Sequence, residues 1–137
     1  MRLLYVICML TMIAGCDPAH KATAKKEPLN GTWIPVREEI GGKPLPAAAF
    51  ATQKLVMEGD TYTFTAESVD KGTVTKSGDR MDIYGKEGVN AGKHFMAIYK
   101  LENGELTICY NLKGDKYPEA FDSKGSPLYF LCVFKKE

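Results

Sequence analysis

Apolar and polar residues alternate along most of the chain after residue 29, and this alternation predicts strands. In TYTFT, residues 61–65, an apolar side chain stands at every second position, as in a half-buried strand. The full set of predicted strands is 31–36, 54–58, 61–65, 72–75, 81–84, 94–101, 106–110 and 128–134. Turn residues separate them, and Asn103-Gly104 is a favoured hairpin turn. Residues 46–51 begin with a proline and predict one short helical turn.

About eight strands with short connections and almost no helix indicate an all-β fold. We expect an antiparallel meander that closes into a barrel, because closure removes the exposed edges that invite aggregation. A two-sheet sandwich is the alternative. The longest connection, residues 113–127, is rich in Gly, Pro and Lys and predicts a loop.

The alternation also predicts which side chains face the interior of the barrel. The candidate inner face consists of Leu55, Met57, Tyr62, Phe64, Met81, Ile83, Ile108 and Tyr110. From strand 94–101 either Met96 and Ile98 or Phe95, Ala97 and Tyr99 join them, because both sets are apolar.

An eight-stranded barrel is either filled by its side chains or holds one small ligand. We expect a shallow apolar pocket at the end away from Trp33, with candidate ligand-binding residues Met57, Tyr62, Phe64, Met81, Ile83 and Tyr110. The alternative is a structural or protein-interaction module of the cell envelope with a filled barrel.

The first residues, MRLLYVICMLTMIAGCD, predict an extracytoplasmic address. A positive charge at Arg2, an apolar run over residues 3–13 and small residues after it are typical of a secretory signal peptide. The run is shorter than the roughly 20 residues that cross a bilayer as a helix. The ending IAGC resembles the bacterial lipobox, in which the chain is cut before a cysteine that receives a diacylglycerol.

This resemblance divides the chain into three parts. Residues 1–15 are a lipoprotein signal peptide, residues 16–28 are the lipidated Cys16 and a polar, flexible tether, and residues 29–137 are the barrel domain. Acyl chains such as palmitate on Cys16 would anchor the protein to a membrane, and two chains hold stably where one does not. We expect a monomer.

Charge and composition exclude several classes of function. The chain has 18 basic and 17 acidic residues without a concentrated positive face, which argues against nucleic-acid binding. The domain has a single histidine, His94, and the sequence contains no G-x-S-x-G nucleophile elbow with which it could act as a base. The histidine and the cysteines show no metal-ligand spacing. Asp82 alternates with Met81 and Ile83 and is predicted to be solvated. We expect neither catalysis nor a cofactor nor a metal.

Cys109 and Cys132 lie on the last two predicted strands. An oxidising compartment would permit a disulfide between them. However, Cys109 alternates with Thr107 and Asn111, whereas Cys132 alternates with Phe130 and Phe134, so the two thiols are predicted to face different sides. Two free core cysteines are the alternative.

Near the domain start, Gly31-Thr32-Trp33 resembles the G-x-W motif of lipocalins. Further along, LNGTWIPV, GGKPLP, LVMEGDTYTF, KGTV, MDIYG, AIYKLENGELTICYN, YPEAFDSKG and FKKE follow in order. This set resembles a small lipocalin-like domain that is abundant in planctomycetes and has no established activity. The resemblance implies structural roles for Gly31 and Trp33, with a cation from Lys135 or Lys136 over the Trp33 ring. GTW also resembles the start of META-domain lipoproteins, but their Gly-Cys-Asn motif is missing.

Overall fold

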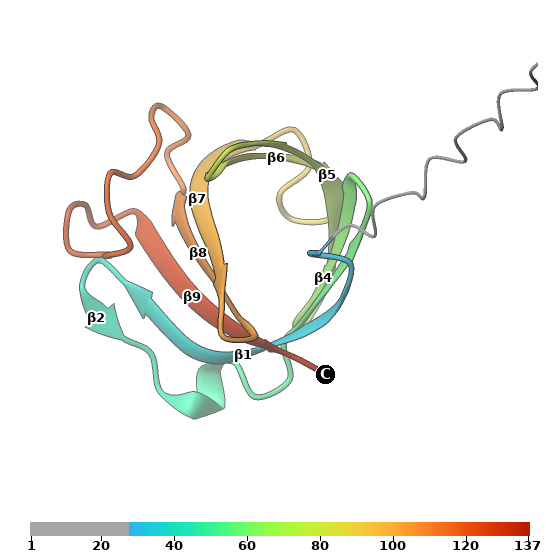
Figure 1. Ribbon diagram of the computed structural model, residues 1–137, viewed down its shortest axis with the longest axis horizontal. Coiled ribbons are helices and arrows are strands. Elements are labelled where there is room, and N and C mark those ends of the chain that lie inside the picture. The colour runs from blue at the N-terminus through green and yellow to red at the C-terminus, as the bar shows by residue number, and fades with distance from the viewer. Residues whose placement is uncertain (1–27) are drawn as a thin grey trace, which may run out of the picture.

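The computed structural model describes residues 28–137, which form one closed antiparallel sheet (Figure 1). The strands are β1 (Gly31–Ile40), β2 (Lys43–Pro44), β3 (Lys54–Glu58), β4 (Thr61–Thr65), β5 (Val69–Ser77), β6 (Arg80–Glu87), β7 (His94–Glu102), β8 (Glu105–Asn111) and β9 (Tyr129–Lys136), with a 3-10 turn, η1 (Ala47–Ala49). Each strand from β3 to β8 pairs with the next, and β1 pairs with both β3 and β9. The fold prediction is therefore confirmed: eight strands form a lipocalin-like barrel, and β2 is a two-residue addition beside β1.

The predicted signal peptide 1–15, Cys16 and all of the tether except Pro28 lie outside the described residues. Within residues 28–137, no helix is long and apolar enough to cross a membrane.

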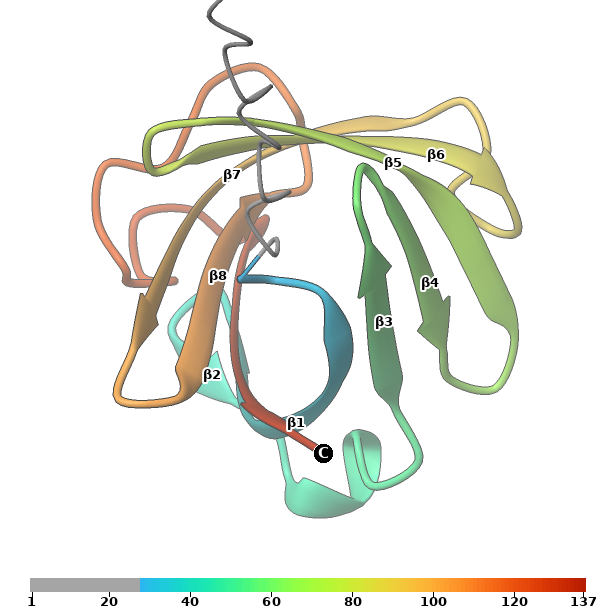
Figure 2. The same ribbon diagram turned by 45° about the vertical axis from the view of Figure 1, so that its right-hand side comes forward.

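Because consecutive strands run in opposite directions, the connections between them alternate between the two ends of the barrel. The tight turns at 59–60, 78–79 and 103–104 lie at the end where β1 starts, which we call the Trp33 end. The connections 66–68, 88–93 and 112–128 lie at the other end, which we call the loop end. Figure 2 shows β3 and β4 side by side and running in opposite directions. Asn103 and Gly104 both have positive φ, 52° and 77°, which confirms the predicted hairpin turn.

At the Trp33 end the side chains pack closely around Trp33, which is 1% exposed. Its indole nitrogen Nε1 donates a hydrogen bond to the Leu29 carbonyl oxygen at 2.9 Å. The Lys136 ammonium nitrogen lies 5.4 Å from the ring centroid, so Lys136 supplies the expected cation. Gly31 leaves room for it, since a Cβ there would come within 2.6 Å of Lys136 Cε. The positions of Gly31 and Trp33 suit the structural roles expected of them.

Strand β1 continues past its predicted end through a β-bulge. Pro35 pairs with Phe134 and Arg37 with Val133, so Val36 is an extra, exposed residue. A bulge tolerates a proline, which has no N–H for the ladder. The extra residue shifts the alternation by one, so Glu38 rather than Arg37 is buried.

The connection 112–128 packs on the outside of the barrel. Tyr117 and Phe121 cover a small second core of Ile98, Cys109 and Leu131 on the outer face of β7, β8 and β9. Figure 1 shows this long connection standing outside β8 and β9. The sequence predicts the loop correctly but not its packing.

Candidate ligand-binding cavity

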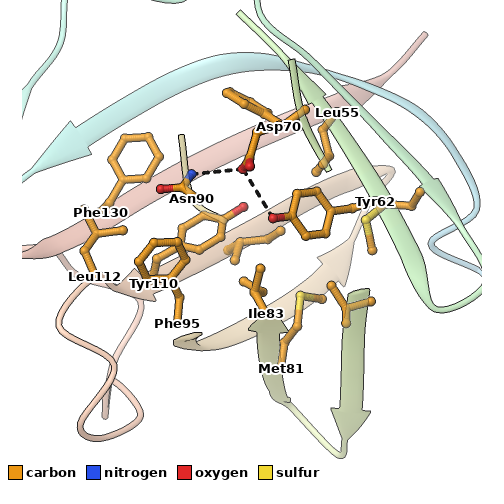
Figure 3. A pocket seen from close by; sticks show the side chains of 14 residues that line it. Leu55, Tyr62, Asp70, Met81, Ile83, Asn90, Phe95, Tyr110, Leu112 and Phe130 are labelled. Atoms are coloured by element: carbon orange, nitrogen blue, oxygen red, sulfur yellow. Dashed lines mark hydrogen bonds between the residues drawn. The ribbon is translucent and has the colours of Figure 1, made fainter. Parts of the chain in front are cut away.

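The barrel encloses a cavity of about 140 Å³. All six candidate ligand-binding residues line it: Met57, Tyr62, Phe64, Met81, Ile83 and Tyr110. The remaining lining residues are Leu55, Asp70, Val74, Asn90, Phe95, Ile108, Leu112 and Phe130 (Figure 3). The side chains therefore do not fill the interior completely.

The structure settles which side of β7 faces inward. Phe95 lines the cavity, Ala97 is fully buried in the barrel core and Tyr99 packs against that core. Met96 and Ile98 face the outside, where both line a groove next to the 112–128 connection. The inner set is thus Phe95, Ala97 and Tyr99.

The cavity lies toward the loop end of the barrel. Asn90 and Leu112 come from connections at that end, and Trp33 is not among the lining residues. Phe64, Phe95 and Phe130 remain partly exposed, whereas Met57 and Met81 are 2% and 1% exposed. This gradient places the mouth at the loop end and the apolar floor toward Trp33.

Among the described residues that line this mostly apolar cavity, Asp70 alone has a charged side chain. Asp70 is 5% exposed, and its Oδ2 accepts hydrogen bonds from Asn90 Nδ2 at 2.9 Å and from the Tyr62 hydroxyl at 3.3 Å (Figure 3). Its other oxygen, Oδ1, is buried and accepts no hydrogen bond from residues 28–137. Burial and the negative charge of Asp70 raise the pKa of Tyr62, so this hydroxyl stays protonated and donates.

Asn90 reaches Asp70 because its loop folds against the end of β6. Gly85 N donates to the Lys93 carbonyl oxygen at 2.9 Å, and Gly92 N donates to the Gly85 carbonyl oxygen at 3.0 Å. A Cβ on Gly85 would lie 1.8 Å from the Asn90 carbonyl oxygen, so this approach requires glycine. The 88–93 connection thereby becomes part of the cavity wall.

A second buried carboxyl lies inside the barrel but outside the cavity lining. Glu38 is 2% exposed and accepts a hydrogen bond from the Cys132 thiol at 3.7 Å. Burial raises the pKa of Glu38, and it also raises the pKa of the nearby Tyr110 hydroxyl, to which Cys132 and Glu38 add smaller effects. The inner wall therefore carries acidic groups on two sides, β1 and β5.

Sequence reasoning missed Asp70 and Glu38 for different reasons. The sequence pattern predicts this strand only from Gly72, whereas β5 starts at Val69 and therefore carries Asp70 on the inner face with Gly72 and Val74. Glu38 follows the bulge, and plain alternation assigns that position to the outside.

The two domain cysteines are free and lie on opposite faces of the sheet. Cys132 belongs to the barrel core, whereas Cys109 belongs to the small outer core. Residue Cys109 pairs with Leu131, and Cys132 pairs with Ile108. The disulfide that was one alternative is therefore absent, because neighbouring positions on paired strands point to opposite sides.

On the outer face, Asp82 is not the solvated carboxylate that the sequence predicted. Its Oδ1 lies 2.7 Å from His94 Nε2, and its Oδ2 accepts a hydrogen bond from the Tyr117 hydroxyl at 2.6 Å. The His94 ring stacks on Tyr84 with centroids 4.5 Å apart. Within the described chain, no serine or cysteine hydrogen bonds to His94, so this group ties the 112–128 connection to β6 rather than forming a nucleophile–base pair.

Among residues 28–137, no three His, Cys, Asp or Glu side chains gather as metal ligands would. No known family model matches the chain, and no curated protein matches it.

Proposed function

We propose that the protein is a binding module that holds a small, mainly apolar molecule in the barrel cavity. The observation that supports this most is a lined cavity of about 140 Å³ at the loop end. A filled barrel, on which the partner-binding alternative rests, would leave no such space.

The volume limits the size of the ligand. An apolar cavity of about 150 Å³ binds benzene or xenon. A ligand with one six-membered ring and a short substituent therefore suits this cavity, and a long acyl chain does not. Methionine side chains at the floor adapt to irregular guests, which favours binding of such a molecule.

The methionine methyl groups offer a direct test of binding. We would titrate the purified full-length protein with ethylbenzene and follow the ¹³C-methyl NMR signals. Met57 and Met81 line the cavity, whereas Met96 lies outside the barrel and serves as an internal control. We expect shifts at Met57 and Met81 with a dissociation constant on the order of 0.1–1 mM, which corresponds to roughly 4–5.5 kcal/mol.

Filling the cavity should remove the binding. Met57→Trp or Ile83→Trp adds a large ring to the lining, so either variant should stay folded and lose the ethylbenzene shifts. If neither ethylbenzene nor toluene shifts Met57 or Met81 in the parent, or if only Met96 responds, the proposal is wrong. The partner-binding role would then replace it.

We further propose that the barrel is presented outside the cytoplasm on a lipid anchor. The support is in the sequence alone: the apolar run, the IAGC ending and a polar tether before the domain. Mass spectrometry of membrane-extracted protein should find Cys16 as the first residue, carrying acyl chains. A chain that begins at Met1 with an unmodified Cys16 would contradict this, and Cys16→Ser should release or misprocess the protein.

We also propose that the domain belongs to the lipocalin-like family that its sequence resembles. This resemblance implies no catalytic residue. We assign binding rather than catalysis, and no cofactor. The proposed partner is a membrane, which the protein would bind through the lipid on Cys16.

A further inference from the structure

We propose that the ligand carries a cationic amine and that Asp70 is the residue that binds it. This inference rests on the proposed function, because it names the chemical class of the molecule that enters the same cavity. The natural ligand would combine a ring-sized apolar body with a primary or secondary ammonium group.

The first argument concerns the charge of Asp70. It is 5% exposed, and the other described side chains that line the cavity are uncharged. The ion pairs among residues 28–137 do not include it. Buried carboxylates are normally compensated by a cation or by several hydrogen bonds, since an uncompensated charge in an apolar setting is costly. The negative charge of Asp70 is therefore not compensated by a cation of the described protein, and a cationic ligand would compensate it.

The second argument concerns hydrogen bonds. Both neutral donors that reach Asp70, from Tyr62 and Asn90, bind Oδ2, and Oδ1 accepts none. A carboxylate has about four acceptor positions, so capacity remains after these two bonds. An ammonium group brings up to three donors and a positive charge, and charge-assisted hydrogen bonds are about twice as strong as neutral ones.

The third argument excludes the opposite ligand charge. None of the described residues that line the cavity is Lys, Arg or His. Tyr62 and Asn90 already direct their donors to Asp70, and Glu38 is a second acidic group behind Tyr110. A carboxylate or phosphate ligand would find no cation and would be repelled by Asp70.

A bare metal ion fits less well than an amine. Asp70 is the only carboxylate among the described lining residues, and divalent ions need several oxygen ligands. The apolar floor formed by Met57, Met81 and Ile83 provides no oxygen ligand for such an ion, whereas it suits the apolar body of an amine.

Three ring compounds of similar size separate these possibilities: benzylamine, neutral ethylbenzene and anionic benzoate. Binding to the full-length protein would be measured by the shifts of Met57 and Met81 at neutral pH. We expect benzylamine to bind at least tenfold more tightly than ethylbenzene, and benzoate not to bind. Hydrogen bonds to a charged group account for a factor of about 10–100.

Asp70→Asn removes the charge while keeping the shape, and Asp60→Asn, in an exposed turn, is the matched control. Asp70→Asn should weaken benzylamine binding about 10- to 100-fold and leave ethylbenzene binding equal or stronger. Asp60→Asn should change neither. The comparison of ligands on the parent protein tests the idea even if Asp70→Asn does not fold.

The outcomes separate this inference from the function on which it rests. If ethylbenzene binds and benzylamine binds no better, or if Asp70→Asn leaves benzylamine binding unchanged, the amine assignment is wrong while the apolar binding function stands. If benzoate binds best, the predicted charge is wrong. If none of the three binds, the binding function itself fails and the inference fails with it.

Discussion

The same paired strands are packed solidly at one end of this barrel and enclose a cavity at the other. On β8 and β9, the Leu106–Phe134 pair near Trp33 is 0% and 1% exposed. Four residues further along β8, the Tyr110–Phe130 pair lines the cavity and remains partly exposed. At the Trp33 end the buried indole N–H has its acceptor, whereas at the loop end Asp70 keeps an oxygen without a donor in the described chain. On the proposed function, the Trp33 end stabilises the fold and the loop end binds the ligand.

Truncation of Trp33 should have the largest effect. Trp33→Ala removes a fully buried aromatic and its hydrogen bond to Leu29, so we expect the free energy of unfolding to fall by about 3–5 kcal/mol. Denaturant unfolding would measure this, with the exposed Val89→Ala as control. An unchanged midpoint for Trp33→Ala would show that the Trp33 end is not the stabilising end.

Glu38→Gln tests whether acidic groups in the barrel wall reduce stability. Because burial raises the pKa of Glu38 in the folded state, the folded protein holds this proton more tightly than the unfolded chain does. The stability that this group contributes is present below its ordinary pKa and is lost as the pH rises through the raised value.

The parent should therefore lose stability relative to Glu38→Gln as the pH rises above 4.5, the ordinary pKa of this carboxyl group. Unfolding of both proteins across this range would measure the difference, with Glu58→Gln on the surface as control. A difference that stays constant or shrinks over this range would contradict the assignment.

Replacing the cation over Trp33 should have a smaller effect. Lys136→Met keeps the length of the side chain and removes the charge, so the free energy of unfolding should fall by about 0.5–1 kcal/mol. Lys135→Met, one residue earlier on the strand, is the matched control. Equal effects of the two variants would show that the contact with the ring contributes nothing specific.

The smallest expected effect concerns the reactivity of the Cys109 and Cys132 thiols. Burial raises the pKa of Cys109 to about 11 and that of Cys132 further, so neither should react with thiol reagents in the folded protein at pH 8. Unfolding without reductant should expose both, and the count of free thiols from these two positions should be two. A count of zero would mean that a disulfide joins them.

Alternation predicts the cavity wall because most of the wall lies on regular strands. Met57, Tyr62, Phe64 and Ile83 each sit in an uninterrupted period of two, so their facing follows from the sequence. The facing of β7 could not be predicted, since Phe95 and Met96 are both apolar and only the pairing with β6 and β8 distinguishes them. Periodicity carries no information where both faces of a strand are buried.

The polar part of the site could not be predicted from the same pattern. The inward position of Glu38 depends on the bulge in β1, and no turn residue in the sequence marks this bulge. The contact between Asn90 and Asp70 depends on how an irregular loop folds back over β6, and loops have no period to read. The packing of Tyr117 and Phe121 on the outer face escaped prediction for the same reason.

The existence of the cavity is the central claim, and a xenon derivative tests it most directly. Crystals of the full-length protein under xenon pressure should show a xenon atom among Met57, Met81 and Ile83, because apolar cavities of this volume bind xenon. The site should disappear in Ile83→Trp. Electron density for a continuous packed core, with no xenon inside the barrel, would contradict the account.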